Sequence, residues 1–273
     1  MPKMRLDALM VERGLVESRA RAQRLIMAGQ VRVNGDLALK PANSIADNAQ
    51  VVIEQGPSFV SRGGEKLASA LTAFQISPAE SVCADVGAST GGFTDCLLQN
   101  GAQRVYAIDV GKGILHWKLR QDPRVVVMEG TNARFVERLP ERVQFVSIDV
   151  AFISLKVLLP VVKNWLTTQT QDAGLDSTQS GNLVALIKPQ FEAGRAEAAR
   201  GDGVIRDPEV HRRVLRSVLE FASSQGYHIE GLKRSPLLGP KGNVEFLAWL
   251  SISTSSREPT SSEQIETWIT AVT

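Results

Sequence analysis

The stretch DVGASTGGFTDCLL, residues 85–98, indicates how the larger part of this chain folds. The apolar run at 82–86 is typical of a buried parallel strand, which ends at Gly87 and is followed by a helix soon after the glycines. The glycines let the backbone turn sharply and approach a ligand closely, and the helix N-terminus offers unpaired N–H groups. A second apolar run over 104–109 ends in an acid, 22 positions after Gly87, where nucleotide-binding α/β folds hold ribose hydroxyls.

The spacing of the glycines narrows the ligand class. A tight strand-to-helix connection without a ligand is the structural alternative, and the acid at 109 argues against it. The glycines at 87, 91 and 92 do not form GxGxxG, and no GK[ST] follows, which disfavours a nucleoside triphosphate. An acid followed by Gly-x-x-x-Gly-Gly resembles motif I of S-adenosylmethionine-dependent methyltransferases.

That resemblance implies S-adenosyl-L-methionine as the cofactor, with the glycine loop near its methionine part and the acid at 109 on its ribose. In these methyltransferases an adenine contact commonly follows the third strand, which corresponds here to position 132. The residues expected to contact the cofactor are Asp85, Gly87, Ala88, Ser89, Gly91, Gly92, Phe93, Asp109, Asn132 and Asp149.

Strands and helices alternate along the rest of the second domain. After a helix at 65–74 and the two strands above, the pattern predicts strands at 124–128, 143–149 and 183–188, helices at 113–120, 154–165 and 208–226, and a final strand pair at 227–234 and 244–251. This alternation predicts an α/β fold with a Rossmann-like, doubly wound and mostly parallel sheet, in which ligands bind beyond the carboxyl ends of the strands. Polar loops are expected at 167–182 and 192–206.

The overall composition is that of a soluble globular protein. The chain has 273 residues, of which 43% are hydrophobic and 22% are charged. It has no apolar run of the length that a membrane span needs, and its N-terminus lacks the apolar core of a signal peptide. Its two cysteines, Cys83 and Cys96, are interpreted as reduced core residues of a cytoplasmic protein. Without a CxxC pair, and with three scattered histidines, no metal site is expected.

The first sixty residues form a separate, basic module. Residues 1–40 carry eight Lys and Arg against four Asp and Glu, and two short amphipathic helices precede a strand at 31–33 and an Asn34-Gly35 turn. A solvated helix pair without a function is the structural alternative. The segments RLDALMVERGL and SRARAQRLIMAGQVRVNG closely resemble the S4 RNA-binding domain, in which two helices and a hairpin present arginines to structured RNA. The residues expected to contact RNA are Arg5, Arg19, Arg21, Arg24, Arg32 and Arg62.

The domain organisation follows from these patterns. The segment at 55–58 is a natural linker, so the expected domains are 1–58 and 59–252, followed by a polar tail at 253–273 with a short helix at 265–272.

Four polar residues of the second domain, Lys66, Asp149, Lys188 and Glu245, belong to the segments SRGGEKL, SIDVAFISL, LIKPQFEAG and GNVEFLAWL. Singly, Lys66 and Glu245 are compatible with surface charges, Asp149 with a helix cap and Lys188 with a strand-end lysine. Together they match the Lys-Asp-Lys-Glu order of the FtsJ-like ribose 2′-O-methyltransferases.

With the RNA-binding module in front, the chain resembles the TlyA family, whose members are named hemolysin A or 16S/23S rRNA 2′-O-methyltransferase. The family resemblance implies methylation of a ribose 2′-hydroxyl in ribosomal RNA or ribosomal subunits, by a monomer that binds neither DNA nor membranes. At two positions the chain departs from the family: Lys112 stands where an aromatic residue is usual, and Gly130 where a basic residue is common.

Methylation of a hydroxyl requires positioning and removal of its proton. Lys188 is assigned as the general base, with Asp149 and Glu245 orienting the two lysines; a purely electrostatic role for Lys188 stays open. Base methylation is disfavoured because the position after the fourth strand carries neither an aromatic-proline motif nor a cysteine. A membrane-lytic protein would need amphipathic or long apolar spans, which the sequence lacks. A non-catalytic RNA-binding factor is the remaining alternative, against which the four intact candidates argue.

Overall fold

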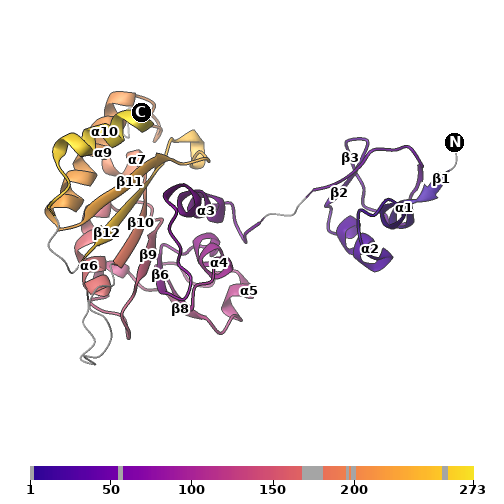
Figure 1. Ribbon diagram of the computed structural model, residues 1–273, viewed down its shortest axis with the longest axis horizontal. Helices are drawn as coiled ribbons and strands as arrows, with labels where there is room; N and C mark the ends of the chain where they lie inside the picture. Colours follow the sequence, from indigo (N-terminus) through magenta and orange to yellow (C-terminus); the bar gives the residue numbers. More distant parts are fainter. Residues whose placement is uncertain (1–2, 55–57, 168–180, 195–196, 198–200, 254–257) are drawn as a thin grey trace. The chain divides into compact units, whose positions relative to one another are not determined.

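A computed structural model describes residues 3–54, 58–167, 181–194, 197, 201–253 and 258–273 (Figure 1). Backbone contacts divide the chain into two units, 1–58 and 59–273, each with its own hydrophobic core.

The first unit packs two short helices against small antiparallel sheets. Its helices are α1 (Leu6–Glu12) and α2 (Arg19–Met27), and its strands are β1 (Lys3–Arg5), β2 (Val31–Val33), β3 (Asp36–Leu37), β4 (Ser44–Ala46) and β5 (Val51–Ile53). Strand β2 lies between β3 and β5, and β1 pairs with β4. The Ser18 hydroxyl caps α2 by accepting the Arg21 N–H at 3.2 Å, as Ser is suited to do. The two helices and β2 match the sequence prediction, whereas β1, β3 and β4 were not predicted.

The second unit is built on one seven-stranded sheet in the order β11-β12-β10-β9-β6-β7-β8. Its strands are β6 (Val82–Val86), β7 (Arg104–Asp109), β8 (Val125–Glu129), β9 (Phe145–Ile148), β10 (Gly181–Ile187), β11 (His228–Arg234) and β12 (Phe246–Ile252). Strand β12 runs antiparallel to both of its neighbours, and the other pairings are parallel. The predicted doubly wound, mostly parallel α/β sheet is thereby confirmed.

Helices cover both faces of this sheet (Figure 1). They are α3 (Gly63–Phe74), α4 (Gly92–Gln99), α5 (Trp117–Arg120), α6 (Leu155–Thr167), α7 (Pro189–Glu192), α9 (Pro208–Ser224) and α10 (Ser262–Val272), with 3-10 turns η1 (Ala133–Phe135) and η2 (Pro240–Gly242). One core joins the sheet to α3, α4 and α5, and the other joins it to α6, α9 and α10. Successive residues of β6 alternate between them: Cys83 faces the first core, and Ala84 the second.

Two elements differ from their predictions. The helix expected at 113–120 is confined to α5, because the Glu129 carboxylate accepts the backbone N–H groups of residues 113–115 in the preceding loop. The residues 258–273 are not a separate tail: α10 buries Ile265 and Ile269 against the second core and begins with a capping box at Ser261 and Gln264. Of the loop predicted at 167–182, residues 168–180 lie outside the described part of the chain, and Gly181 already begins β10.

Candidate functional site

A cleft of about 700 Å³ lies at the carboxyl ends of the parallel strands β6, β7, β9 and β10. This is where ligands bind in open α/β sheets. Its lining includes Gly87, Ser89, Asp109, Val110, Ile114, Thr131, Asn132, Asp149, Phe152 and Lys188. The lining of the cleft therefore combines polar and charged groups with apolar side chains.

Glycine is required at two points of the loop that forms the floor of the cleft. Gly87 has φ +84°, and a Cβ at this position would lie 2.3 Å from the backbone oxygen of Asp149. Gly91 has φ +99°, and a Cβ there would lie 2.1 Å from Cδ1 of Leu119. Both positions have a left-handed backbone that favours glycine, and a Cβ would meet backbone at Gly87 and leucine side chains at Gly91. The sequence motif is thus explained by close packing of the loop on β9 and α5.

Asp109 joins two loops at the edge of the cleft. Its Oδ2 accepts the Ser89 N–H at 2.8 Å, and its Oδ1 accepts the Gly111 N–H at 2.7 Å. The carboxylate therefore ties the glycine loop after β6 to the loop after β7. Because each carboxylate oxygen can accept a second hydrogen bond, Asp109 also has acceptor capacity for a ligand hydroxyl in the cleft.

Asp85 lies beneath the glycine loop and is fully buried. Its carboxylate accepts hydrogen bonds from the hydroxyls of Thr94 at 2.7 Å and Ser147 at 3.1 Å. Burial raises the pKa of Asp85 to about 7. The carboxylate therefore links β6 to α4 and β9 from below. Among the residues expected to contact the cofactor, Gly87, Ser89, Asp109, Asn132 and Asp149 line the cleft, whereas Asp85, Ala88, Gly91, Gly92 and Phe93 are buried outside its lining.

Glu129, at the end of β8, is a site residue that the sequence reasoning missed. Its carboxylate accepts three consecutive backbone N–H groups, from residues 113, 114 and 115, at 2.8–3.0 Å, and also the guanidinium of Arg120 at 2.5 Å. The Arg120 hydrogen bond, together with the backbone donors, lowers the pKa of Glu129 to about 2. The carboxylate holds the loop that brings Val110 and Ile114 into the cleft. The signal that could have identified Glu129 is its position directly after the strand predicted at 124–128.

The two departures from the family pattern contact each other. A Cβ at Gly130 would lie 2.5 Å from Cε of Lys112, so the lysine chain passes directly over the glycine. Gly130 also has φ +64° and donates its N–H to the Gly111 carbonyl at 2.9 Å. Lys112 and Gly130 therefore pack against each other, with the lysine side chain over the glycine.

The four catalytic candidates form two ion pairs. Lys188 Nζ lies 2.5 Å from Asp149 Oδ1, and both residues line the cleft. Lys66 Nζ lies 2.6 Å from Glu245 Oε2, with side chains 8% and 0% exposed, and neither residue lines the cleft. Within the described part of the chain, the other carboxylate oxygen of Glu245 has no hydrogen-bond partner. The structure thus assigns each lysine an acid.

The Glu192 carboxylate connects the segments that follow Asp149 and Lys188. Glu192 on α7 accepts the Ser154 hydroxyl at 2.6 Å and the Leu155 N–H at 2.8 Å, at the N-terminus of α6. Burial raises the pKa of Glu192. Next to it the rings of Phe152 and Phe191 lie 4.9 Å apart, and Lys188 Nζ lies 5.9 Å from the Phe191 ring centroid. Asp149 and Lys188 therefore lie on segments that are bonded together.

Phe152 is the most exposed aromatic side chain of the cleft. It is 90% exposed, and its backbone adopts φ +64°, a conformation that is unusual for a bulky residue. Since burial does not hold the ring there, its position at the mouth of the cleft points to contact with a ligand.

The arginines expected to contact RNA differ in their surroundings. Arg5 and Arg19 both pair with Asp7, and Arg32 pairs with Glu54 at 2.6 Å. Arg21 and Arg24 are exposed on α2, and Arg62 is exposed at the N-terminus of α3 in the second unit.

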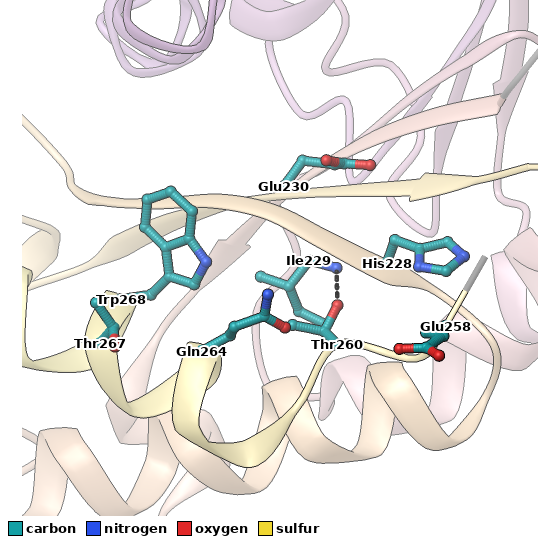
Figure 2. A pocket seen from close by; sticks show the side chains of 8 residues that line it. All are labelled: His228, Ile229, Glu230, Glu258, Thr260, Gln264, Thr267 and Trp268. Carbon is teal, nitrogen blue, oxygen red and sulfur yellow. Dashed lines mark hydrogen bonds between the residues drawn. The ribbon is translucent and has the colours of Figure 1, made fainter.

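A second hollow, of about 600 Å³, lies between the edge strand β11 and α10 (Figure 2). His228, Glu230, Gln264 and Trp268 are among its lining residues, and Thr260 Oγ1 accepts the Ile229 N–H there at 3.0 Å. It shares no lining residue with the cleft and contains none of the expected site residues. The cleft at the strand ends is therefore the candidate site.

Family models and known proteins match both units of the chain. A family model described as FtsJ-like methyltransferase matches residues 59–252, and one described as the S4 domain matches residues 4–51. The TlyA protein of Mycobacterium tuberculosis, a 16S/23S rRNA (cytidine-2′-O)-methyltransferase, is 44% identical over 92% of this chain and 91% of its own length. Hemolysin A of Brachyspira hyodysenteriae is 41% identical over 90% of this chain and 98% of its own length. A solved structure from Streptococcus thermophilus is 42% identical, with a TM-score of 0.69 over 99% of this chain and 96% of that chain. Among the helices that the structure describes, none is both long and apolar enough to cross a bilayer.

Proposed function

Because this chain belongs to the FtsJ-like methyltransferase family, in its TlyA branch, we propose that it methylates a ribose 2′-hydroxyl of ribosomal RNA. The observation that carries the proposal is the Lys188–Asp149 ion pair, which lies in the same cleft as the glycine loop and Asp109.

The residues of the cleft fit S-adenosyl-L-methionine, the cofactor of this family. Gly87 and Ser89 line the cleft, and Asp109 keeps acceptor capacity for ribose hydroxyls. Val110 and Ile114 offer an apolar wall to an adenine ring, next to the polar Asn132. When bound, the cofactor supplies a methyl group made electrophilic by its attachment to a sulfonium.

The proton of the ribose hydroxyl passes to the Lys188–Asp149 pair. A hydroxyl is a weak nucleophile until its proton leaves, and Lys188 Nζ accepts a proton when the amine is neutral. The O–H electron pair would then be available for the O–CH₃ bond, while the S–CH₃ bond breaks and its electron pair stays on the cofactor's sulfur. The resulting ammonium would be stabilised by Asp149, whose Oδ1 lies 2.5 Å from Nζ. Asp149 also keeps the lysine amine in the cleft as its ion-pair partner. The buried Lys66–Glu245 pair supports α3 and the start of β12 behind the site.

Phe152 provides a stacking surface for the substrate. Its ring is 90% exposed, lines the cleft and lies 4.9 Å from the Phe191 ring. Proteins that act on a single nucleotide stack its base on aromatic side chains, which are tolerant of base identity. We infer that Phe152 stacks on the base of the nucleotide whose ribose is methylated.

The substrate class follows from both units. An S4 domain with exposed arginines suits structured RNA, whose recognition relies on phosphates and 2′-hydroxyls. Since DNA lacks the 2′-hydroxyl that is methylated, we infer that the substrate is ribosomal RNA and not DNA. The two buried free cysteines are consistent with action in the reducing cytoplasm, where we propose that the protein acts as a monomer.

The experiment is methyl transfer from radiolabelled S-adenosyl-L-methionine to purified ribosomal subunits, followed by mapping of nucleotides that resist alkaline cleavage. The proposal predicts label on a ribose, and loss of label when the mapped nucleotide carries a 2′-deoxyribose. Label on a base, or label that persists on the 2′-deoxy substrate, contradicts it.

A further inference from the structure

Asp7 is a fully buried carboxylate at the start of α1, and three side chains converge on it. Arg5 donates to both oxygens, from Nε at 3.0 Å and Nη2 at 2.9 Å. Arg19 Nη2 and Gln23 Nε2, both on α2, donate to Oδ2 at 3.2 and 2.9 Å. One acid therefore fixes two guanidinium groups from different elements of the first unit. These hydrogen bonds hold the pKa of Asp7 well below its usual range.

The arginines remain accessible although their acid is buried. Their side chains are 49% and 55% exposed, against 0% for Asp7. Within the described residues, Arg5 Nη1 and the Nε and Nη1 of Arg19 have no acceptor, so these donors are available to an outside ligand. Guanidinium groups match phosphate oxygens in a planar, bidentate geometry.

We propose that Asp7 is a positioning residue, which holds Arg5 and Arg19 as a preorganised guanidinium pair for the phosphate backbone of RNA. This inference rests on the proposed function, because it takes the first unit as the RNA-binding module. Binding normally requires flexible side chains to be ordered, and ordering costs affinity. Two arginines that are already oriented by one acid avoid most of that cost.

The positioning role and a simple charge effect predict opposite changes in RNA affinity when Asp7 is neutralised. Asp7 carries a negative charge next to two phosphate-binding cations, so long-range electrostatics alone predicts that its neutralisation strengthens RNA binding. Positioning predicts the opposite, because the freed arginines gain rotational freedom. The two explanations are therefore separable by one substitution.

The test uses the full chain and purified ribosomal RNA, with dissociation constants measured by filter binding. Asp7→Asn keeps the shape of the side chain and removes its charge; Glu12→Gln, at an exposed position of the same helix, is the matched charge control. We expect Glu12→Gln to bind RNA at least as tightly as the wild type, and Asp7→Asn to bind about tenfold more weakly. Binding of Asp7→Asn that equals that of Glu12→Gln overturns the proposal.

A second variant addresses the possibility that Asp7→Asn unfolds the first unit. Arg5→Lys keeps the positive charge but cannot form the two-pronged contact with Asp7. With Asp7 in place it should also weaken binding. In the Asp7→Asn background, when circular dichroism shows that the first unit is folded, it should cause little further loss, because the two residues act as one unit. An unchanged affinity for Arg5→Lys, or additive losses in the double variant, overturns the inference. If the proposed function itself fails, wild-type protein will not bind ribosomal RNA, whereas failure of the positioning role leaves wild-type binding intact.

Discussion

Lys188 and Asp149 form a 2.5 Å ion pair across the carboxyl ends of the adjacent strands β10 and β9. Each residue directly follows its strand, so the parallel register of the sheet brings together two side chains that are far apart in the sequence. The pair is further supported from α7, where Glu192 bonds to the start of α6. The proposed proton acceptor and its proposed orienting acid are therefore held by the most regular part of the fold.

Substitution of Lys188 separates its two proposed roles. Lys188→Ala should reduce methyl transfer by about 10²- to 10⁴-fold, the range for loss of a general base. Lys188→Arg keeps the positive charge but cannot accept a proton, so it should be as inactive as the alanine variant if the lysine is a base. Single-turnover rates, with cofactor binding measured by calorimetry, are the required data. Substantial activity in Lys188→Arg would instead show that the residue acts through its charge.

Glu129 should govern cofactor affinity without taking part in the reaction. In Glu129→Gln the loop at 111–115 loses the charged acceptor of its N–H groups, so we expect weaker binding of S-adenosyl-L-methionine and a raised KM for it, with kcat little changed. The exposed Glu137→Gln is the control. A lowered kcat with unchanged KM would contradict this role.

The acid dependence of stability provides a second measurement on Glu129. Its pKa of about 2 lies below the value of about 4.3 for an unfolded chain. Its contribution to the free energy of unfolding is therefore fully present above about pH 4.3 and is lost as the pH falls toward about 2. The difference in unfolding free energy between wild type and Glu129→Gln should therefore shrink across this window. A difference that stays constant with pH would show that the charge of Glu129 is not involved.

Asp85 should affect stability in the opposite sense. Its pKa of about 7 lies above the value of about 3.9 for an unfolded chain. The contribution of the protonated carboxyl to the free energy of unfolding is therefore greatest at low pH and is lost as the pH rises from about 4 to about 7. Asp85→Asn removes the ionisation, so its stability relative to wild type should increase across that window in urea unfolding. Because Asp85 lies outside the lining of the cleft, the variant should still bind the cofactor. A stability difference that is independent of pH would contradict the assignment.

The sequence predicted those parts of the site that follow from strand order. Asp109, Asp149 and Lys188 each end or follow a strongly apolar strand, so the rule that ligands bind at the carboxyl ends brings them together. The Lys66–Glu245 pair joins residues 179 positions apart, and its partners could be matched only through the family resemblance.

Other features depend on three-dimensional detail that no periodic pattern carries. Glu129 accepts backbone N–H groups whose directions depend on the conformation of the loop. The same hydrogen bonds explain why the helix predicted at 113–120 is limited to α5. The role of Asp85 depends on which way its carboxylate points from β6, into the space between α4 and β9. The helix predicted at 265–272 is confirmed as α10, but its packing against the second core was not predicted, because only two of its residues, Ile265 and Ile269, are buried apolar side chains.

Removal of the Phe152 ring should impair RNA methylation while leaving the fold and the cofactor site intact. Stacking of one base on an aromatic ring contributes about 1–3 kcal/mol, so Phe152→Ala should lower kcat/KM for RNA by about ten- to hundredfold. Phe152→Trp, which restores a stacking surface, should recover most of this loss. Phe135→Ala removes another exposed ring, 72% accessible on η1 and outside the lining of the cleft, and is the matched control. Because Phe152 is 90% exposed, its truncation should not reduce thermal stability. Equal effects of Phe152→Ala and Phe135→Ala on RNA methylation would show that the ring at the cleft has no special contact with the substrate.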